Sequence, residues 1–156
     1  MSGMKLSELL DESNIITDLN ARDKKGVLEE LVAAVINHEP SIDKHTLVKV
    51  LLERERLGST GIGDGVAIPH GKYHGISQPL VSFGRSRSGL DFESMDGQPA
   101  HLFFLLVAPE NSANVHLKVL ATIARILKNS AFRKALMEAG SEEEIYRKIA
   151  QYDEEF

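Results

Sequence analysis

The sequence contains no cysteine, and this absence limits both its chemistry and its location. Without cysteine there is no disulfide framework, no thiol nucleophile and no thiolate ligand for a metal ion. The absence fits a reducing compartment, so we expect the protein in the cytoplasm. Since 42% of the 156 residues are hydrophobic, the chain can build one substantial core without disulfides or metals.

An excess of positive charge and a long apolar run are also lacking. The 18 basic and 23 acidic side chains give a formal net charge of -5, which opposes binding to nucleic acid or to an anionic lipid surface. The longest apolar run, Leu102 to Ala108, is far shorter than the roughly 20 residues that a membrane-spanning helix needs. The first residues show no apolar signal core. We therefore expect a soluble, non-secreted protein with no membrane span and no nucleic-acid partner.

The apolar pattern predicts one domain of alternating helices and strands. No internal repeat or Pro/Ser-rich linker divides the chain, so we expect a single domain over residues 1–156. Apolar spacing predicts a helix from Lys24 to Ile36, and Asp43 is a suitable N-cap for a second helix that ends near Leu57. The full set of predicted helices is 6–10, 24–36, 44–57, a long helix from 115, 131–139 and 142–150. Predicted strands are 14–19, 66–68, 80–83 and 101–108, the last buried on both faces, in an α/β layered domain.

A glycine-rich stretch precedes the most informative histidine. Gly58 to Gly65 holds four glycines in eight positions, which predicts a loop and argues against a helix or strand interior. Pro69 ends the short strand that follows, so His70 ends that strand or comes directly after it. Amides of such a loop can bind phosphate oxygens, and Lys72 or an arginine can supply positive charge. By spacing alone, an anion site and a plain tight connection beside a surface histidine are equally good interpretations.

Other ligand-binding patterns do not fit this loop. The nucleotide P-loop is absent, because Asp64 stands where that pattern has lysine, and a dinucleotide fingerprint fails at Val66. His70 and His74 have the spacing of metal ligands on a helix, but Pro69 argues against a helix there. No G-x-S-x-G motif presents a serine nucleophile. We therefore expect no cofactor and no metal.

Three residues are candidates for phosphoryl chemistry. A neutral imidazole can itself attack an activated phosphoryl group near pH 7, which suits His70 as an acceptor. His116 lies near the start of the long predicted helix, where anions are favoured, and Arg54 lies just before the glycine loop. An ordinary helix-surface histidine and an arginine in a solvated charged segment are the plain alternatives for these two.

A long signature resembles that of a known family, the fructose/mannitol-type enzyme IIA domains of the bacterial phosphotransferase system and their nitrogen-regulatory relatives. The residues that carry it are Arg54-Glu55-Arg56-Leu57-Gly58-Ser59-Thr60-Gly61-Ile62-Gly63-Asp64-Gly65-Val66-Ala67-Ile68-Pro69-His70-Gly71-Lys72. A second similar segment includes Asp96-Gly97-Gln98-Pro99 and Val115-His116-Leu117, and the similarity covers nearly the whole chain. The resemblance implies the α/β sandwich of mannitol-type enzyme IIA, a mixed sheet flanked by helices.

The same resemblance implies a function for each candidate residue. His70 would accept a phosphoryl group from the phosphohistidine of the small carrier HPr or of its nitrogen-branch paralogue. Arg54 and His116 match the arginine and second histidine that line the family's site, where they bind phosphoryl oxygens and orient His70. Ser59 and Thr60 are weaker candidates for the same role. No ATP, cofactor or metal takes part directly.

Two functions can share this site. One is a nitrogen or metabolic regulator whose phosphorylation a target protein senses; the other is a sugar-specific enzyme IIA that serves a fructose- or mannitol-type IIB permease component. The sequence has no fused IIB, IIC or HPr-like segment and its loop is Gly-Ser-Thr-Gly-Ile-Gly, which favours the regulator. Asp64 replaces an asparagine common in relatives, and its carboxylate would repel a phosphoryl group unless turned away or paired. His101 stands at a position where relatives commonly have an acidic residue.

Overall fold

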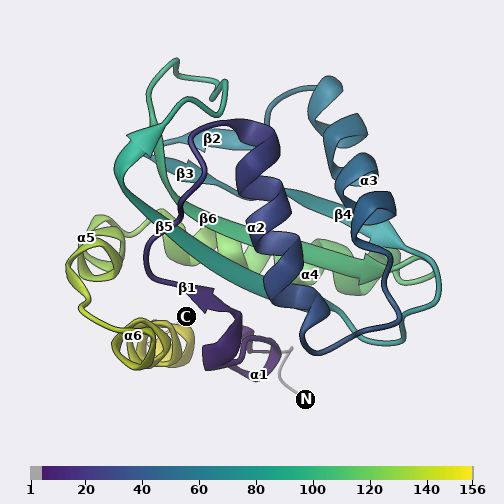
Figure 1. Cartoon of the computed structure of the whole chain (residues 1–156). Coiled ribbons are helices and arrows are strands. Elements are labelled where there is room, and N and C mark those ends of the chain that lie inside the picture. Colours follow the sequence, from purple (N-terminus) through teal and green to yellow (C-terminus); the bar gives the residue numbers. More distant parts are fainter. Residues whose placement is uncertain (1–4, 156) are drawn as a thin grey trace.

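A six-stranded mixed sheet lies between two layers of helices in the computed structural model of the chain (Figure 1). The structure describes residues 5–155, so residues 1–4 and 156 of the predicted domain lie outside the described part. Helices α2 (Lys24–Ile36) and α3 (Lys44–Arg56) cover one face of the sheet. The other face is covered by α1 (Leu6–Leu9), α4 (Ala113–Leu127), α5 (Ser130–Glu138) and α6 (Glu142–Glu155).

The strands are ordered β1-β5-β6-β3-β2, and β4 also pairs with β6. Their bounds are β1 (Ile15–Ile16), β2 (Gly61–Gly63), β3 (Val66–Ala67), β4 (His70–Tyr73), β5 (Leu80–Leu90) and β6 (Ala100–Pro109). β5 runs antiparallel to β6, whereas β3 and β4 run parallel to it along its other edge. The mixed sheet flanked by helices is the predicted fold class, and the buried centre predicted for residues 101–108 is confirmed by β6.

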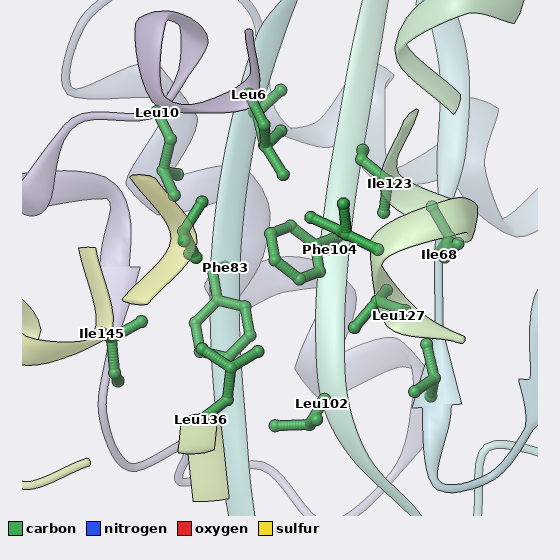
Figure 2. Close-up of a cluster of buried hydrophobic side chains, with 14 of the residues drawn as sticks. Leu6, Leu10, Ile68, Phe83, Leu102, Phe104, Ile123, Leu127, Leu136 and Ile145 are labelled. Atoms are coloured by element: carbon green, nitrogen blue, oxygen red, sulfur yellow. The ribbon is translucent and has the colours of Figure 1, made fainter. Parts of the chain in front are cut away.

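Successive residues of β6 supply two separate cores. Leu102, Phe104 and Leu106 pack with the α4 layer, where the Phe104 ring lies 4.9 Å from that of Phe83 (Figure 2). Phe103, Leu105 and Val107 pack with α2 and α3 on the opposite face. Successive side chains of a strand point to opposite faces, so an unbroken apolar run is the pattern of a strand covered on both sides.

The chain forms β3 and β4 as two consecutive parts of the same edge of β6. Val66 and Ala67 align with Leu102 and Phe103, and His70 aligns with Leu106 further along. Pro69 separates the two parts because it has no N–H to donate to the ladder, although its carbonyl still accepts from the amide of Leu106 at 3.0 Å. His70 therefore follows β3, as predicted, and begins a new strand.

The prediction of a loop throughout Gly58 to Gly65 was wrong for part of it. Residues 61–63 form β2, which pairs with β3 through a two-residue turn at Asp64 and Gly65. Both turn residues have positive φ, 57° and 76°, which is the conformation that Asp-Gly favours in hairpins. Gly61 also has no room for a side chain, because a Cβ there would lie 2.3 Å from the Ser94 hydroxyl.

Most predicted helices are confirmed, but two strands differ in length. The strand predicted over 14–19 has only Ile15 and Ile16 in the sheet, because the Thr17 carbonyl accepts instead from the side chain of Arg85 at 3.0 Å. The strand predicted over 80–83 extends to Leu90 with an irregularity after Arg85. The second half of β5, Gly84 to Gly89, is polar, so the sequence gives little sign that the strand continues.

Buried Arg85 joins three parts of the fold. Its side chain is fully buried, and Nη1 donates to the carbonyl of Leu136 at 2.9 Å and to that of Ala139 at 2.6 Å. These carbonyls lie at the end of α5, where a helix has no backbone donors left to satisfy them. Burial lowers the pKa of Arg85 from its ordinary value. One side chain thus ties β5 to α5 and to the segment after β1.

Candidate functional site

His70 is the first residue of β4, at an edge of the sheet. Its ring Nδ1 lies 2.8 Å from the carbonyl oxygen of Ile68, two residues earlier. Because a carbonyl can only accept a hydrogen bond, Nδ1 must carry the proton in the neutral ring. The lone pair is then on Nε2. Since His70 aligns with Leu106, which packs with the α4 layer, its side chain lies on the α4 face of the sheet.

His116 meets His70 from the first turns of α4. The two ring centroids are 5.4 Å apart, with the rings at 68° to one another. His116 is only 8% exposed, and its Nδ1 is buried without a hydrogen-bond partner in the described residues. A charged imidazolium donates from both nitrogens, so this orphaned atom disfavours the charged form. His116 is thus a neutral, closely packed neighbour of His70.

Both histidines are held neutral by their surroundings. Burial lowers the pKa of His70; the bond to Ile68 opposes this shift, and the charge of Arg54 adds to it. Burial also lowers the pKa of His116, and the charges of His70 and Lys72 contribute in the same direction. A ring whose pKa lies below its ordinary value is unprotonated near pH 7, and an unprotonated ring nitrogen can act as a nucleophile.

Arg54 approaches the same site from the other helical layer. It lies in the last turn of α3, and its Nη1 donates to the carbonyl of Gly58 at 2.9 Å. This bond satisfies a carbonyl just beyond the helix end and directs the guanidinium toward the glycine-rich segment. The remaining N–H groups of a guanidinium suit the planar, two-point binding of phosphate oxygens. The structure thus brings together His70, His116 and the charge of Arg54.

Ser59 and Thr60 have hydroxyls that are already engaged within the protein. Thr60 is 3% exposed, and its hydroxyl donates to the carboxylate of Glu55. The Ser59 hydroxyl donates to the carbonyl of Phe92 at 3.1 Å and accepts from the amide of Gly61 at 3.0 Å. In this structure, both side chains shape the segment between α3 and β3.

Glu55 organises this segment, a role that was not predicted from the sequence. Its carboxylate accepts from the amide of Thr60 at 3.1 Å and lies 3.1 Å from Nζ of Lys24, which also stacks over the ring of Phe92. The only signal in the sequence is its position. Leu47, Leu51 and Glu55 follow one another at four-residue spacing, so an acidic residue occupies the buried stripe of α3.

The two unusual residues, Asp64 and His101, lie away from His70. Asp64 lies at the β2–β3 turn, close to the part of β6 around Leu102. His70 pairs with Leu106, four residues further along β6. At about 3.3 Å per residue, this separates them by roughly 13 Å along the strand. Asp64 is therefore distant from the candidate site along the sheet. His101 packs against Gly89, and its Nδ1 lies 3.0 Å from the Ser86 carbonyl, which gives it a structural role.

The described residues show neither a group of metal ligands nor a membrane-spanning helix. Between residues 5 and 155, no three His, Cys, Asp or Glu side chains are grouped as ligands for a metal ion. No helix in this part of the chain combines the length and apolar character needed to cross a membrane.

The family model described as "Phosphoenolpyruvate-dependent sugar phosphotransferase system, EIIA 2" matches residues 8–152. The chain belongs to this family. Its sequence is 40% identical over 150 residues to a fructose-specific EIIABC component of the phosphotransferase system from Bacillus subtilis. That match covers 96% of this chain but only 24% of the relative. It is likewise 40% identical over 147 residues to a nitrogen regulatory protein of Bradyrhizobium diazoefficiens, covering 94% of this chain and 95% of the relative.

Solved structures agree with this assignment. The nitrogen regulatory protein IIA-Ntr of Neisseria meningitidis superposes with a TM-score of 0.86 and 37% sequence identity, covering 92% of this chain and 98% of that one. The mannitol IIA of Escherichia coli superposes with a TM-score of 0.73 at 20% identity, over 89% of this chain and 97% of that one. The expected fold of mannitol-type enzyme IIA is thus confirmed, as is membership of the predicted family.

Proposed function

We propose that the chain is a histidine phosphocarrier and that Nε2 of His70 is the acceptor atom. In the transfer, Nε2 forms a bond to phosphorus while the bond from phosphorus to the donor's ring nitrogen breaks, and that nitrogen keeps the electron pair. The observation that carries this proposal is the 2.8 Å contact between Nδ1 and the Ile68 carbonyl, which leaves the lone pair on Nε2. The same carbonyl stabilises the positive charge that develops on the ring during attack.

The neighbours of His70 would neutralise the phosphoryl oxygens. Arg54 supplies a positive charge that acts on the His70 ring, and His116 lies beside that ring as a neutral N–H donor. Phosphoryl transfer between two imidazoles depends mainly on in-line positioning and electrostatic stabilisation. Because the hydroxyls of Ser59 and Thr60 have partners inside the protein, we give them the supporting role of shaping the adjacent segment.

The donor we propose is HPr or its nitrogen-branch paralogue, and the favoured role is nitrogen or metabolic regulation in the cytoplasm. Two relatives named as nitrogen regulatory proteins match this chain over 95% and 98% of their own lengths. The alternative is a sugar-specific enzyme IIA, which the fructose-specific relative supports with the same 40% identity as the Bradyrhizobium protein. In that role a IIB component would receive the phosphoryl group; one solved structure with this fold is a complex of Escherichia coli mannitol IIA with phosphorylated IIB.

Phosphorylation on His70 can be tested by intact mass spectrometry. The chain is incubated with phosphoenolpyruvate, enzyme I and either HPr or its nitrogen-branch paralogue. We expect one acid-labile phosphoryl group on the wild type and none on His70→Ala. His74→Ala is the matched control, because the side chain of His74 is 89% exposed and pairs only with Glu110 at 3.4 Å. Phosphate on His70→Ala, or its absence from wild type with both donors, would contradict the proposal; a faster reaction with HPr would favour the sugar-specific role.

A further inference from the structure

Lys72 lies on the same face of β4 as His70. Successive side chains of a strand alternate between its two faces, so residues 70 and 72 share one face while residues 71 and 73 share the other. A Cβ at Gly71 would touch side chains of α3, and Tyr73 packs with the core between the sheet, α2 and α3. These two residues mark the α3 face of the strand. Lys72 is therefore on the α4 face, beside the candidate site.

The ammonium group of Lys72 is available for a ligand. Lys72 is exposed, and in the part of the chain that the structure describes it has no ion-pair partner. Glu110, the carboxylate directly after β6, instead lies 3.4 Å from Nδ1 of His74. The charge of Lys72 lowers the pKa of His116, so it acts on the ring that packs against His70. Lys72 is thus an unpaired positive charge beside the two site histidines.

The proposed phosphohistidine carries more negative charge than Arg54 alone can balance. A phosphoryl group has about 1.5 to 2 negative charges near pH 7. Arg54 supplies one positive charge, while burial lowers the pKa of both site histidines and keeps them neutral. Lys24 is already engaged, because its Nζ lies 3.1 Å from carboxylate oxygens of both Glu55 and Glu93. Part of the phosphoryl charge is therefore left for another cation.

We propose that the ammonium of Lys72 binds a phosphoryl oxygen once the phosphoryl group is on Nε2 of His70. Residues two apart on a strand are separated by about 7 Å, a distance that the flexible four-carbon stem of lysine can span. Arg54 comes from α3 and Lys72 from β4, so two separate elements would each supply one charge to the group. The inference rests on the proposed function of His70 and adds a residue to that site.

Two other roles for this lysine predict different behaviour. A lysine on an edge strand commonly prevents pairing with another sheet, and that role would leave phosphorylation unchanged. A lysine near the site can also attract a protein donor, and that role would affect only transfer from that donor. A small phosphodonor separates these roles from the binding of phosphoryl oxygens, because phosphoramidate has no protein surface to dock.

The first measurement is the initial rate at which phosphoramidate phosphorylates the full chain, followed by intact mass spectrometry. Nε2 of His70 forms a bond to phosphorus while the P–N bond of phosphoramidate breaks. The protonated nitrogen of phosphoramidate leaves as ammonia with the electron pair, and Nδ1 of His70 keeps its proton. Lys72→Gln should lower this rate by about three- to fivefold at low salt, the effect of one exposed charge pair. The difference should shrink as salt is added.

The second measurement is the equilibrium distribution of the phosphoryl group between the protein donor and the chain, which docking rates do not affect. A cation that binds only the phosphorylated form favours that form, so Lys72→Gln should shift the distribution toward the donor by about the same three- to fivefold. Lys72→Arg keeps the positive charge and should restore both quantities to within about twofold of the wild type. Both variants should keep the urea unfolding curve of the wild type, because Lys72 is exposed.

Lys134→Gln is the matched control, since it removes an exposed lysine of α5, on the opposite side of the sheet from β4 (Figure 1). Its rate and equilibrium should equal those of the wild type. Equal slowing by Lys72→Gln and Lys134→Gln, or an effect of Lys72→Gln on the rate with the protein donor alone, would overturn the inference and leave the proposed function intact. Absence of phosphate from the wild type with every donor would instead remove the proposed function, and the inference with it.

Discussion

The tautomer of His70 is set by the backbone just before its own strand and not by another side chain. The Ile68 carbonyl that accepts from Nδ1 lies just before Pro69, in the interruption between β3 and β4. No carboxylate is needed to orient the ring. Burial lowers the pKa of His70, so the ring remains neutral at physiological pH. A nucleophile prepared in this way suits repeated, reversible loading with a phosphoryl group.

Removing either neighbour of His70 should slow phosphorylation without unfolding the protein. Arg54→Ala removes the positive charge near the ring, and His116→Ala removes the adjacent imidazole. Loss of one group that stabilises a transferring anion costs about 10²- to 10³-fold in rate. We therefore expect initial rates with a saturating phosphodonor to fall by roughly that factor. Quenched-flow phosphorylation with ³²P measures them.

Arg56→Ala is the matched control for Arg54→Ala, because Arg56 is an exposed arginine of the same helix end. Its rate should equal that of the wild type, and cooperative urea unfolding should be retained in all three variants. If Arg54→Ala and Arg56→Ala are slowed equally, net charge and not a positioned guanidinium explains the effect. If His116→Ala unfolds, its role is structural.

Much of the site could be predicted from the sequence, and what could not has a physical reason. His70, Arg54 and His116 belong to segments that a family signature marks, so residue types and order sufficed to name them. The role of Glu55 was not predicted, because a glutamate in a charged helix end is normally solvated. Only tertiary contacts reveal that the Glu55 carboxylate is buried against Lys24 and Thr60.

The end of α3 and the segment that follows it form one hydrogen-bonded unit. Glu55 on the helix accepts from both the amide and the hydroxyl of Thr60, and Arg54 bonds the carbonyl of Gly58 between them. This unit fixes the path by which the chain enters β2. It also holds Arg54 where the charge of its guanidinium lowers the pKa of His70. The stability of this element and the placement of the arginine are therefore linked.

Thr60→Val tests this unit, because it keeps the side-chain shape and removes the hydroxyl. A buried carboxylate oxygen of Glu55 then lacks a donor, and such a loss costs about 1–3 kcal/mol. We expect the free energy of unfolding, measured with urea, to fall by that amount. Thr122→Val is the control, since its exposed hydroxyl bonds only the Lys118 carbonyl, and it should change stability by less than about 0.5 kcal/mol. Equal effects of the two substitutions would contradict the role given to Thr60.

Elements with strong periodicity were predictable, while elements made by tertiary pairing were not. The helix Lys24–Ile36 has the bounds that its apolar spacing predicts, and Asp43 caps α3 as expected. β2 was missed because glycine suggests a loop, although Asp64-Gly65 is itself a recognised hairpin signal. β5 was predicted too short because buried Arg85 and Ser86 look like surface residues until α5 and β6 surround them.

At the scale of the whole molecule, the candidate site lies where both helical layers reach one edge of the sheet. α3 brings Arg54 from one face and α4 brings His116 from the other, while β4 presents His70 between them. α4 packs in one of the two cores that flank β6, and α3 packs in the other. Protonation of His70 and His116 should therefore change both the geometry of the site and the free energy of unfolding of the whole protein.

The lowered pKa values of His70 and His116 predict how stability depends on pH. Both groups have folded pKa values below the ordinary 6.5, so the unfolded chain binds more protons as the pH falls below 6.5. Their stabilising contribution is present above pH 6.5 and is lost as the pH falls through the folded values, by at most about 1.4 kcal/mol per histidine and pH unit. The carboxyls of Asp11 and Asp43, whose pKa values are lowered from 3.8 mainly by hydrogen bonds to Ser13 and Thr46, titrate at lower pH.

The measurement is the free energy of unfolding by urea at pH 7.5 and pH 5.5 for the wild type and for His70→Gln/His116→Gln. The wild type should lose more stability between the two pH values than the double variant, because glutamine does not titrate and removes the proton linkage of both rings. An equal loss in the wild type and in the double variant would show that the two rings are not held neutral by burial, and the same result would remove the reason for treating His70 as a ready nucleophile at pH 7.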